Sequence, residues 1–300
     1  MSWLFEPFQY EFMQRALVAC ALIGFTNGFL GSFVVLRRLA LMADALSHSL
    51  LPGLAVSAIF IGLNPGGLLV GGLLAALFVA LGGHLMARSS RLKDETAIAA
   101  LYIIAFAAGI ALIKYAKVRV SLDHFLFGNI LAVGDADLWI SYLVGAVVLL
   151  SLVILHRPLL LALFEVSVAR SQGVRVDALL GWLIVLIVLT MVSSLQAVGV
   201  LLSLGLMILP AATVYLLTDS YSSLAVRSGA LGMAGAVAGL LVSYWTNIPS
   251  GPAIIMVLGL VFLLAYLFSP KYGIIAARWR KRHLHEESLE RWPDSSVEKR

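Results

Sequence analysis

Long apolar stretches constrain this 300-residue chain more than any other feature. A helix needs about 20 apolar residues to cross the hydrocarbon core of a bilayer. We read nine such stretches, approximately at residues 13–36, 40–62, 66–87, 96–114, 136–155, 177–195, 197–217, 224–246 and 252–269. Because 61% of the residues are hydrophobic and 12% are charged, an ordinary soluble domain, with about 25% charged residues, is excluded. The sequence therefore predicts an all-α polytopic membrane protein.

The boundary between the sixth and seventh stretches leaves two counts open. Only the short segment from Gln196 to Gly199 interrupts the apolar run there. The two stretches would therefore form either two helices or one long kinked helix. We expect nine transmembrane helices, with eight as the alternative.

The distribution of lysine and arginine predicts the orientation. Cytoplasmic segments of membrane proteins carry an excess of both residues. With nine spans and the N-terminus outside, the inner segments hold 17 of the 21 lysines and arginines. We therefore expect the N-terminus outside and the C-terminus in the cytoplasm. This topology also accounts for the net charge of +5 without nucleic acid as a partner.

Three parts follow from the same pattern. Residues 1–12 are expected to lie at the outer membrane interface, residues 13–270 to form the transmembrane domain, and residues 271–300 to form a polar cytoplasmic tail. The first residues are acidic and aromatic rather than basic, so we expect no cleavable signal peptide. Glycines spaced by four, such as Gly24 and Gly28, are expected to bring helices of one subunit into close contact.

One pair of ionisable residues falls inside a predicted span. Asp44 and His48 lie in the run LALMADALSHSLLPGLA, and their spacing of four places them on one helix face. A charge inside a span costs about 2.5–3.5 kcal/mol on insertion scales and needs a partner, a water-filled path or a bound cation. A carboxylate and an imidazole are half of a site for a first-row divalent metal, and two copies would supply four ligands. The alternative is a structural Asp–His pair.

Other histidines and acidic residues form weaker patterns. His84 is expected at the membrane interface, and the adjacent Asp123 and His124 are expected in a solvated outer loop. His283 and His285 in the tail would bind a metal only loosely. The sequence contains no GxxxxGK[ST], HExxH or GxSxG motif, so we expect a chain that is not an enzyme. If transport is driven by ATP, another chain must hydrolyse it.

The longest inner segment runs from His156 to Asp177, and its middle is apolar although it lies outside the predicted spans. A short amphipathic helix there, ended by Gly173, could dock into a groove of a partner protein. It could equally lie in the lipid interface. The residues alone leave both interpretations open.

Several motifs in the same order resemble the permease subunit of metal-uptake ABC transporters, the family that serves manganese, iron and zinc. They are PFQYEFMQRAL, GSFVVLRRLALMADALSHSLLPGLA, LFGNIL, QAVGVLLSLGLMILPAAT and IPSGPAI, and together they extend from about residue 7 to 270. The chain departs from the family pattern at Ala43, where the family usually has glycine. This departure affects helix packing more than it affects the two candidate ligands.

The resemblance implies an alternating-access importer in the plasma membrane of a prokaryote. It implies a dimer of permease subunits, identical or paralogous, with cytoplasmic subunits that bind ATP and an extracytoplasmic metal-binding protein. It also implies that the metal passes Asp44 and His48, and that no resident cofactor is held by this chain. The opening motif favours manganese or iron over zinc. The inner segment resembles the part that couples to the ATPase, with Phe164, Glu165, Ala169, Arg170 and Gly173 as the residues concerned.

Two other functions remain open. An ion-coupled secondary transporter would need no ATPase and would use Asp44 and His48 as a proton relay. A structural or assembly protein of the membrane would hold them as a buried pair. A membrane enzyme is the least supported, because the sequence offers no nucleophile motif and no phosphate site.

Overall fold

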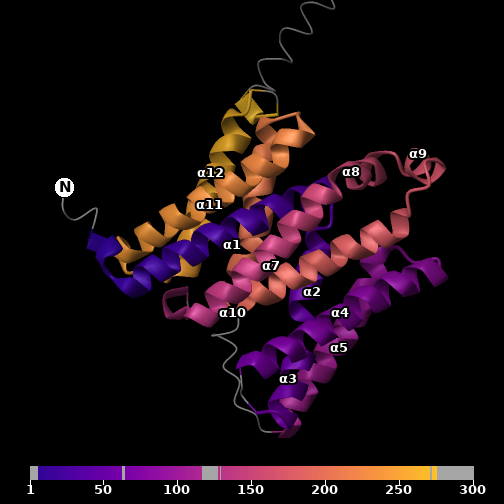
Figure 1. Cartoon of the computed structure of the whole chain (residues 1–300), viewed down its shortest axis with the longest axis horizontal. Helices are drawn as coiled ribbons and strands as arrows, with labels where there is room; N and C mark the ends of the chain where they lie inside the picture. Colours follow the sequence, from indigo (N-terminus) through magenta and orange to yellow (C-terminus); the bar gives the residue numbers. More distant parts are fainter. Residues whose placement is uncertain (1–5, 63–64, 117–127, 129, 271, 276–300) are drawn as a thin grey trace, which may run out of the picture.

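The computed structural model describes residues 6–62, 65–116, 128, 130–270 and 272–275. Within these residues the chain is helical and contains no β-strand (Figure 1). Nine helical segments in the described residues are long and apolar enough to cross a membrane. The all-α polytopic fold and the count of nine are therefore confirmed.

The helices begin and end within a few residues of the predicted limits. The 3₁₀-helices η2 (Glu6–Gln9) and η3 (Ile130–Ala132) accompany them. The α-helices are α1 (Glu11–Leu36), α2 (Ala40–His48), α3 (Leu51–Phe60), α4 (Pro65–Ser89), α5 (Asp94–Ala116), α7 (Asp135–Ile154), α8 (His156–Phe164), α9 (Val166–Ser171), α10 (Val176–Leu217), α11 (Tyr221–Thr246) and α12 (Ser250–Phe268).

The second span consists of two helices instead of one. Helix α2 ends at His48, and α3 begins at Leu51 with Pro52 in its first turn. Proline has no backbone N–H and constrains the residue before it, so it is tolerated where a helix starts but not in its interior. The break therefore falls directly after the second residue of the candidate metal pair.

Helix α10 is kinked at Gly199, whose backbone angles (φ 78°, ψ 167°) are not helical. A straight helix of its 42 residues would be about 63 Å long, which would hold its two ends far apart. Both ends of α10 nevertheless lie beside the segment formed by α8 and α9. Val176 packs with Ala162 and Ala169 near the first end, and Phe164 contacts Tyr221 just beyond the other end. The sequence leaves nine or eight spans open. The fold thus favours nine, with a separate span on each side of Gly199.

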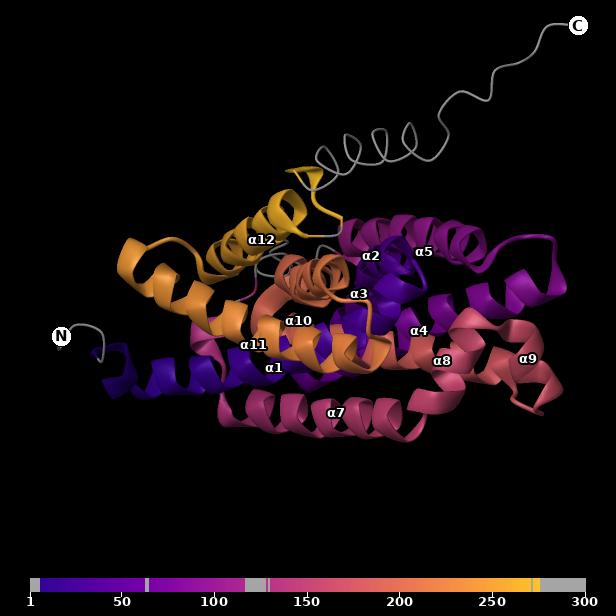
Figure 2. The ribbon, with the colours of Figure 1, turned by 90° about the horizontal axis from the view of Figure 1, so that it is seen from above.

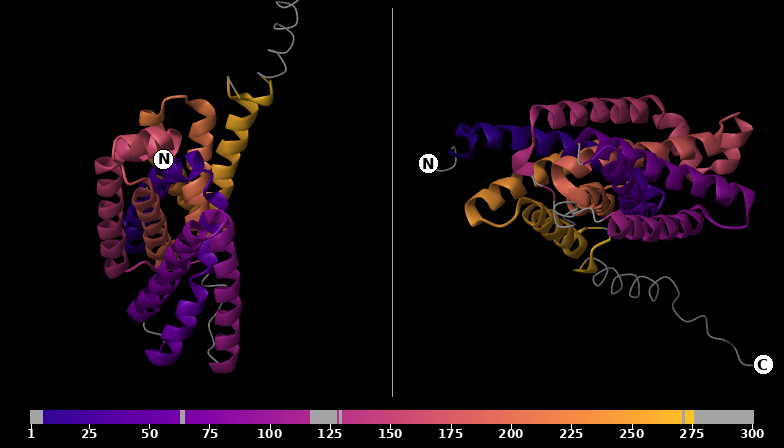
Figure 3. Two further views of the ribbon diagram at one scale, coloured as in Figure 1. Left: turned by 90° about the vertical axis from the view of Figure 1, so that its right-hand side faces the viewer. Right: turned by 90° about the horizontal axis from the view of Figure 1, so that it is seen from below.

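Two groups of helices make up the molecule. Figure 2 shows α1 beside α7 and α11, and side chains such as Leu17, Leu240 and Ile254 join α1, α11 and α12 in one hydrophobic cluster. Helices α3, α4 and α5 pack together as a second group, which extends to the bottom of Figure 1 and of the left view in Figure 3. Helix α2 and the first part of α10 connect the groups through buried residues that include Leu46 and Leu183.

The glycine pair of α1 allows the backbones of α1 and α11 to touch. A Cβ atom at Gly24 would lie 2.6 Å from the carbonyl oxygen of Gly232, and one at Gly28 would meet the carbonyl oxygen of Ser228. Small residues permit this close approach of helices in lipid. The expected close packing within one subunit is therefore confirmed at this contact.

Replacing Gly24 by valine should force α1 and α11 apart. Overpacking of this kind costs about 1–3 kcal/mol, so we expect a lower thermal midpoint and less protein in the membrane. Gly259→Val is the matched control, because nothing lies within 4 Å of a Cβ atom at Gly259. Equal abundance and thermal midpoint for the two variants would contradict the inferred role of this contact.

Candidate metal-transport site

Asp44 and His48 face each other on the last turns of α2. The distance between His48 Nε2 and Asp44 Oδ1 is 3.9 Å. The side chain of His48 is 37% exposed and that of Asp44 is 55% exposed, although both belong to a span whose most apolar window is 67% buried. Contact between lipid and an uncovered ionisable pair inside the membrane is unfavourable in free energy. Such a pair is therefore suited to a water-filled path or to a contact with another subunit.

The neighbouring hydroxyl groups are engaged by their own helix. Ser47 Oγ donates to the carbonyl oxygen of Asp44 at 2.6 Å, and Ser49 Oγ donates to that of Leu46 at the same distance. Such bonds satisfy serine hydroxyls inside the membrane without another partner. The carboxylate and the imidazole are therefore the candidate metal-binding groups of α2.

One chain alone offers an incomplete site. Among the described residues, no group of three or more histidine, cysteine, aspartate or glutamate side chains is placed to hold a metal ion. First-row divalent metals usually take four to six ligands, so two protein ligands need further ligands from water or from another chain. This geometry suits transient binding better than a resident metal.

The side of His48 away from solvent meets two aromatic rings of α5. The Tyr102 ring lies 6.4 Å from the imidazole, centre to centre, at an interplanar angle of 29°. The Phe106 ring lies 5.8 Å away at 80°. Sequence reasoning missed both residues, because they are apolar positions more than 50 residues further along the chain.

The other sequence candidates do not join this pair. His84 Nδ1 lies 2.9 Å from Asp94 Oδ1, and the buried His84 ring ties the end of α4 to the start of α5. The side chain of His84 is covered by protein, and its expected position at the depth of the membrane interface stays a prediction. Asp123, His124, His283 and His285 lie outside the described residues.

The inner segment forms two short helices, α8 and α9, joined at Glu165. Gly173 ends the second helix in the left-handed conformation (φ 79°). Its N–H donates to Arg170, and the N–H of Val174 donates to Ala169, which is the Schellman pattern expected for a C-terminal glycine. The end at Gly173 therefore follows the sequence prediction, whereas the single helix expected there is broken into two at Glu165.

The five candidate coupling residues have different environments. Ala169 is fully buried and packs with Ala162 and Val176, so it fixes α9 against α10. Phe164 is 46% exposed at the joint, where its ring lies 4.5 Å from that of Tyr221 at the start of α11. Glu165 is also exposed. The exposed surface of the segment therefore includes this joint and continues along α9 to Gly173.

Ion pairs tie the same segment to two helices. Arg170 Nη2 lies 3.6 Å from Asp177 Oδ1, and Arg88 Nη2, at the end of α4, lies 3.3 Å from Asp177 Oδ2. Asp177 is in the first turn of α10. One carboxylate thus joins α9, α10 and α4, a connection between distant residues that the sequence alone does not reveal.

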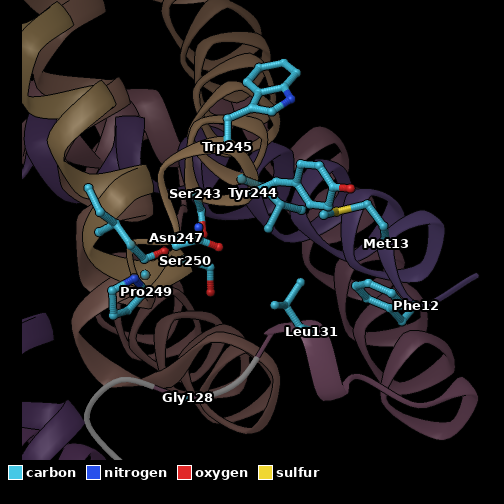
Figure 4. Close-up of a pocket in the computed structure, with 13 residues that line it drawn as sticks. Phe12, Met13, Gly128, Leu131, Ser243, Tyr244, Trp245, Asn247, Pro249 and Ser250 are labelled. Carbon is cyan, nitrogen blue, oxygen red and sulfur yellow. The ribbon is translucent and has the colours of Figure 1, made fainter. Parts of the chain in front are cut away.

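A cavity of about 770 Å³ opens at the other end of the molecule. Figure 4 shows aromatic side chains around it, with Phe12 from α1 and Tyr244 and Trp245 from α11. The turn between α11 and α12, where Ser243 Oγ donates to the carbonyl oxygen of Ile248, forms one wall. No lining residue belongs to α2 or α5, so this cavity is separate from the Asp44–His48 pair.

Comparison with known proteins shows a consistent set of relatives. The sequence profile of the ABC 3 transport family matches residues 9–269. The chain is 37% identical over 281 residues to the manganese transport system membrane protein MntC of Listeria monocytogenes, with 94% of this chain and 99% of the relative covered. It is 40% identical over 264 residues to the manganese import system permease protein ScaB of Streptococcus parasanguinis, with 88% of this chain and 92% of the relative covered.

A solved structure gives the same match at the level of the fold. The structure described as PsaBC from Streptococcus pneumoniae in complex with Fab includes a chain that superimposes with a TM-score of 0.79 and 34% identity. The superposition covers 92% of this chain and 99% of that one.

Proposed function

This chain belongs to the ABC 3 transport family and is the permease subunit of a metal-uptake ABC transporter, and we propose that it imports manganese with energy from ATP hydrolysed by a partner subunit. The observation that carries this proposal is the exposed Asp44–His48 pair inside a membrane span. The names of the relatives favour manganese over iron and zinc.

The proposed route passes between two permease subunits. Each subunit contributes one carboxylate and one imidazole, so two copies about a two-fold axis supply four protein ligands. The exposure of Asp44 and His48 in the single chain supports this arrangement, since lipid would be a costly neighbour for either group. A site with few ligands also binds the metal weakly enough to release it into the cell.

Energy would enter through the segment of α8 and α9. We expect a cytoplasmic ATPase to dock at Phe164 and Glu165, which are exposed at the joint between the two helices. The Phe164–Tyr221 contact connects this joint to α11, and the Asp177 ion pairs connect α9 to α4. Helix α4 packs with α3 and α5, so movement of the segment can reach the group of helices around His48.

Removal of the Asp177 carboxylate should weaken this connection without abolishing transport. All three side chains of the network are 41% or more exposed, and an exposed ion pair is worth at most about 1 kcal/mol. Because Asp177 makes two such pairs, we expect Asp177→Asn to reduce manganese uptake per ATP hydrolysed by no more than about thirtyfold. The measurement is initial uptake divided by ATP hydrolysed, in proteoliposomes.

The matched control is Asp135→Asn, which removes a comparable exposed pair with Arg15 at the opposite end of the molecule. This control should leave the ratio of uptake to hydrolysis at the wild-type value. An unchanged ratio for both variants would remove Asp177 from the coupling pathway.

On the predicted outer side, the cavity between α1, α11 and α12 supports docking of an extracytoplasmic metal-binding protein. Its mixture of aromatic rings and polar groups resembles the composition of protein interfaces. Its lining includes residues 247–251, the turn between α11 and α12, and we expect this turn to face the metal-binding protein.

Cellular metal content tests the function as a whole. We expect cells that lack their own manganese importers to regain manganese when this chain is expressed with its ATPase and metal-binding protein. Iron and zinc should change less. If zinc alone is restored, the transported metal is zinc instead of manganese. If no metal is restored although all chains are in the membrane, the result contradicts the proposed function.

A further inference from the structure

The His48 imidazole is poorly fixed by its own helix. His48 is the last residue of α2, and α3 begins only at Leu51. Its distance of 3.9 Å from Asp44 is too long for a hydrogen bond, and no other hydrogen bond of the imidazole is found among the described residues. Orientation of the ring must therefore come from packing.

One face of α5 supplies that packing. Tyr102 and Phe106 are one turn apart and contact the imidazole from the same helix, one ring nearly parallel to it and the other edge-on. Three residues further along, Gly109 lies against Pro52, because a Cβ atom there would come within 2.8 Å of the Pro52 nitrogen. Helix α5 thus follows the joint between α2 and α3 from the imidazole to the proline.

The two rings cover one side of the imidazole, and 37% of the His48 side chain remains exposed among the described residues. The two rings block rotation toward α5, while Asp44 lies on the same face of α2 as His48. A ligand that is already held in its binding orientation loses less side-chain freedom when the metal binds. Metal-binding histidines are usually oriented by a second group, and here aromatic rings are the groups in contact.

We propose that Tyr102 and Phe106 are positioning residues that hold His48 ready to bind the transported metal with Asp44. The inference rests on the proposed function of the Asp44–His48 pair and names residues that the family motifs do not include. The rings act through their shape, so the phenolic hydroxyl of Tyr102 is not required.

Titration of the full chain in lipid nanodiscs with Mn²⁺ tests the proposal. We expect Tyr102→Leu and Phe106→Leu each to raise the dissociation constant for Mn²⁺ about threefold to tenfold, the effect of freeing one side chain. Tyr102→Phe keeps the ring and should stay within about twofold of wild type. Tyr115→Leu on α5 and Phe78→Leu on α4 are matched controls, since these side chains are 89% and 72% exposed.

Thermal midpoints measured on the same samples separate positioning from folding. The proposal holds if binding weakens for both leucine variants and recovers with Tyr102→Phe while the midpoints remain equal. It is overturned if both leucine variants bind Mn²⁺ as wild type does, or if Tyr102→Phe binds as weakly as Tyr102→Leu. Mn²⁺ binding by the His48→Ala variant is measured in parallel. If this variant binds Mn²⁺ as wild type does, the result contradicts the proposed function instead.

Discussion

Asp44→Asn and His48→Ala should each lower manganese accumulation at least about tenfold at equal membrane abundance. Each change removes one of the two proposed ligands of a chain, and in the proposed symmetric dimer each removes two of four. Removal of a residue that only hydrogen-bonds to a metal ligand typically weakens metal binding about 10–100-fold. Removal of the ligand itself should weaken binding at least as much. The measurement is the metal content of cells, normalised to the amount of permease in the membrane.

The chain contains its own matched control for this experiment. His84 and Asp94 form a second histidine–aspartate pair, 2.9 Å apart, between α4 and α5. We expect Asp94→Asn to leave accumulation within about twofold of wild type after normalisation to membrane abundance, because neither His84 nor Asp94 belongs to the candidate metal site. If Asp44→Asn and His48→Ala also leave accumulation unchanged, the pair on α2 is structural.

Phe164→Asp should abolish stable association with the ATPase. The ring is 46% exposed at the joint between α8 and α9, where the predicted partner docks. Aromatic residues at the centre of an interface often contribute about 2 kcal/mol or more, so the substitution should weaken binding at least about thirtyfold. Copurification of the ATPase with the permease from membranes is the direct measurement.

Leu92→Asp is the control for this substitution. Leu92 is 43% exposed and lies between α4 and α5, at the same predicted inner end but outside the segment. It should leave the ATPase bound. If Phe164→Asp also leaves the ATPase bound, the segment lies in the lipid interface, which is the alternative that the sequence leaves open.

The helical fold could be predicted because its main signal is local. The length of an apolar stretch sets whether it can span a bilayer, so the spans are visible without knowledge of their neighbours. The sequence leaves the break within α10 open, because only the four residues from Gln196 to Gly199 separate two apolar runs there. Gly199 resolves it, since its left-handed φ of 78° ends the first helix and turns the chain.

The candidate site was only half visible in the sequence. Asp44 and His48 are conspicuous, because ionisable residues are costly inside a span. Tyr102 and Phe106 carry no such signal, since aromatic residues are ordinary in a membrane helix and their contact with His48 depends on how α5 packs. The same holds for Asp177, which looks like a helix start and only in the fold joins Arg88 and Arg170.

Reconstituted transport tests the central claim most directly. Proteoliposomes would hold the permease, its ATPase and the metal-binding protein loaded with radioactive manganese on the outer side, and ATP would be supplied on the side of the ATPase. The account predicts manganese uptake that requires ATP, stops when an ATPase-deficient partner is used, and is lost with His48→Ala. Uptake by the permease alone, driven by a proton gradient without ATP, would contradict it and identify a secondary transporter.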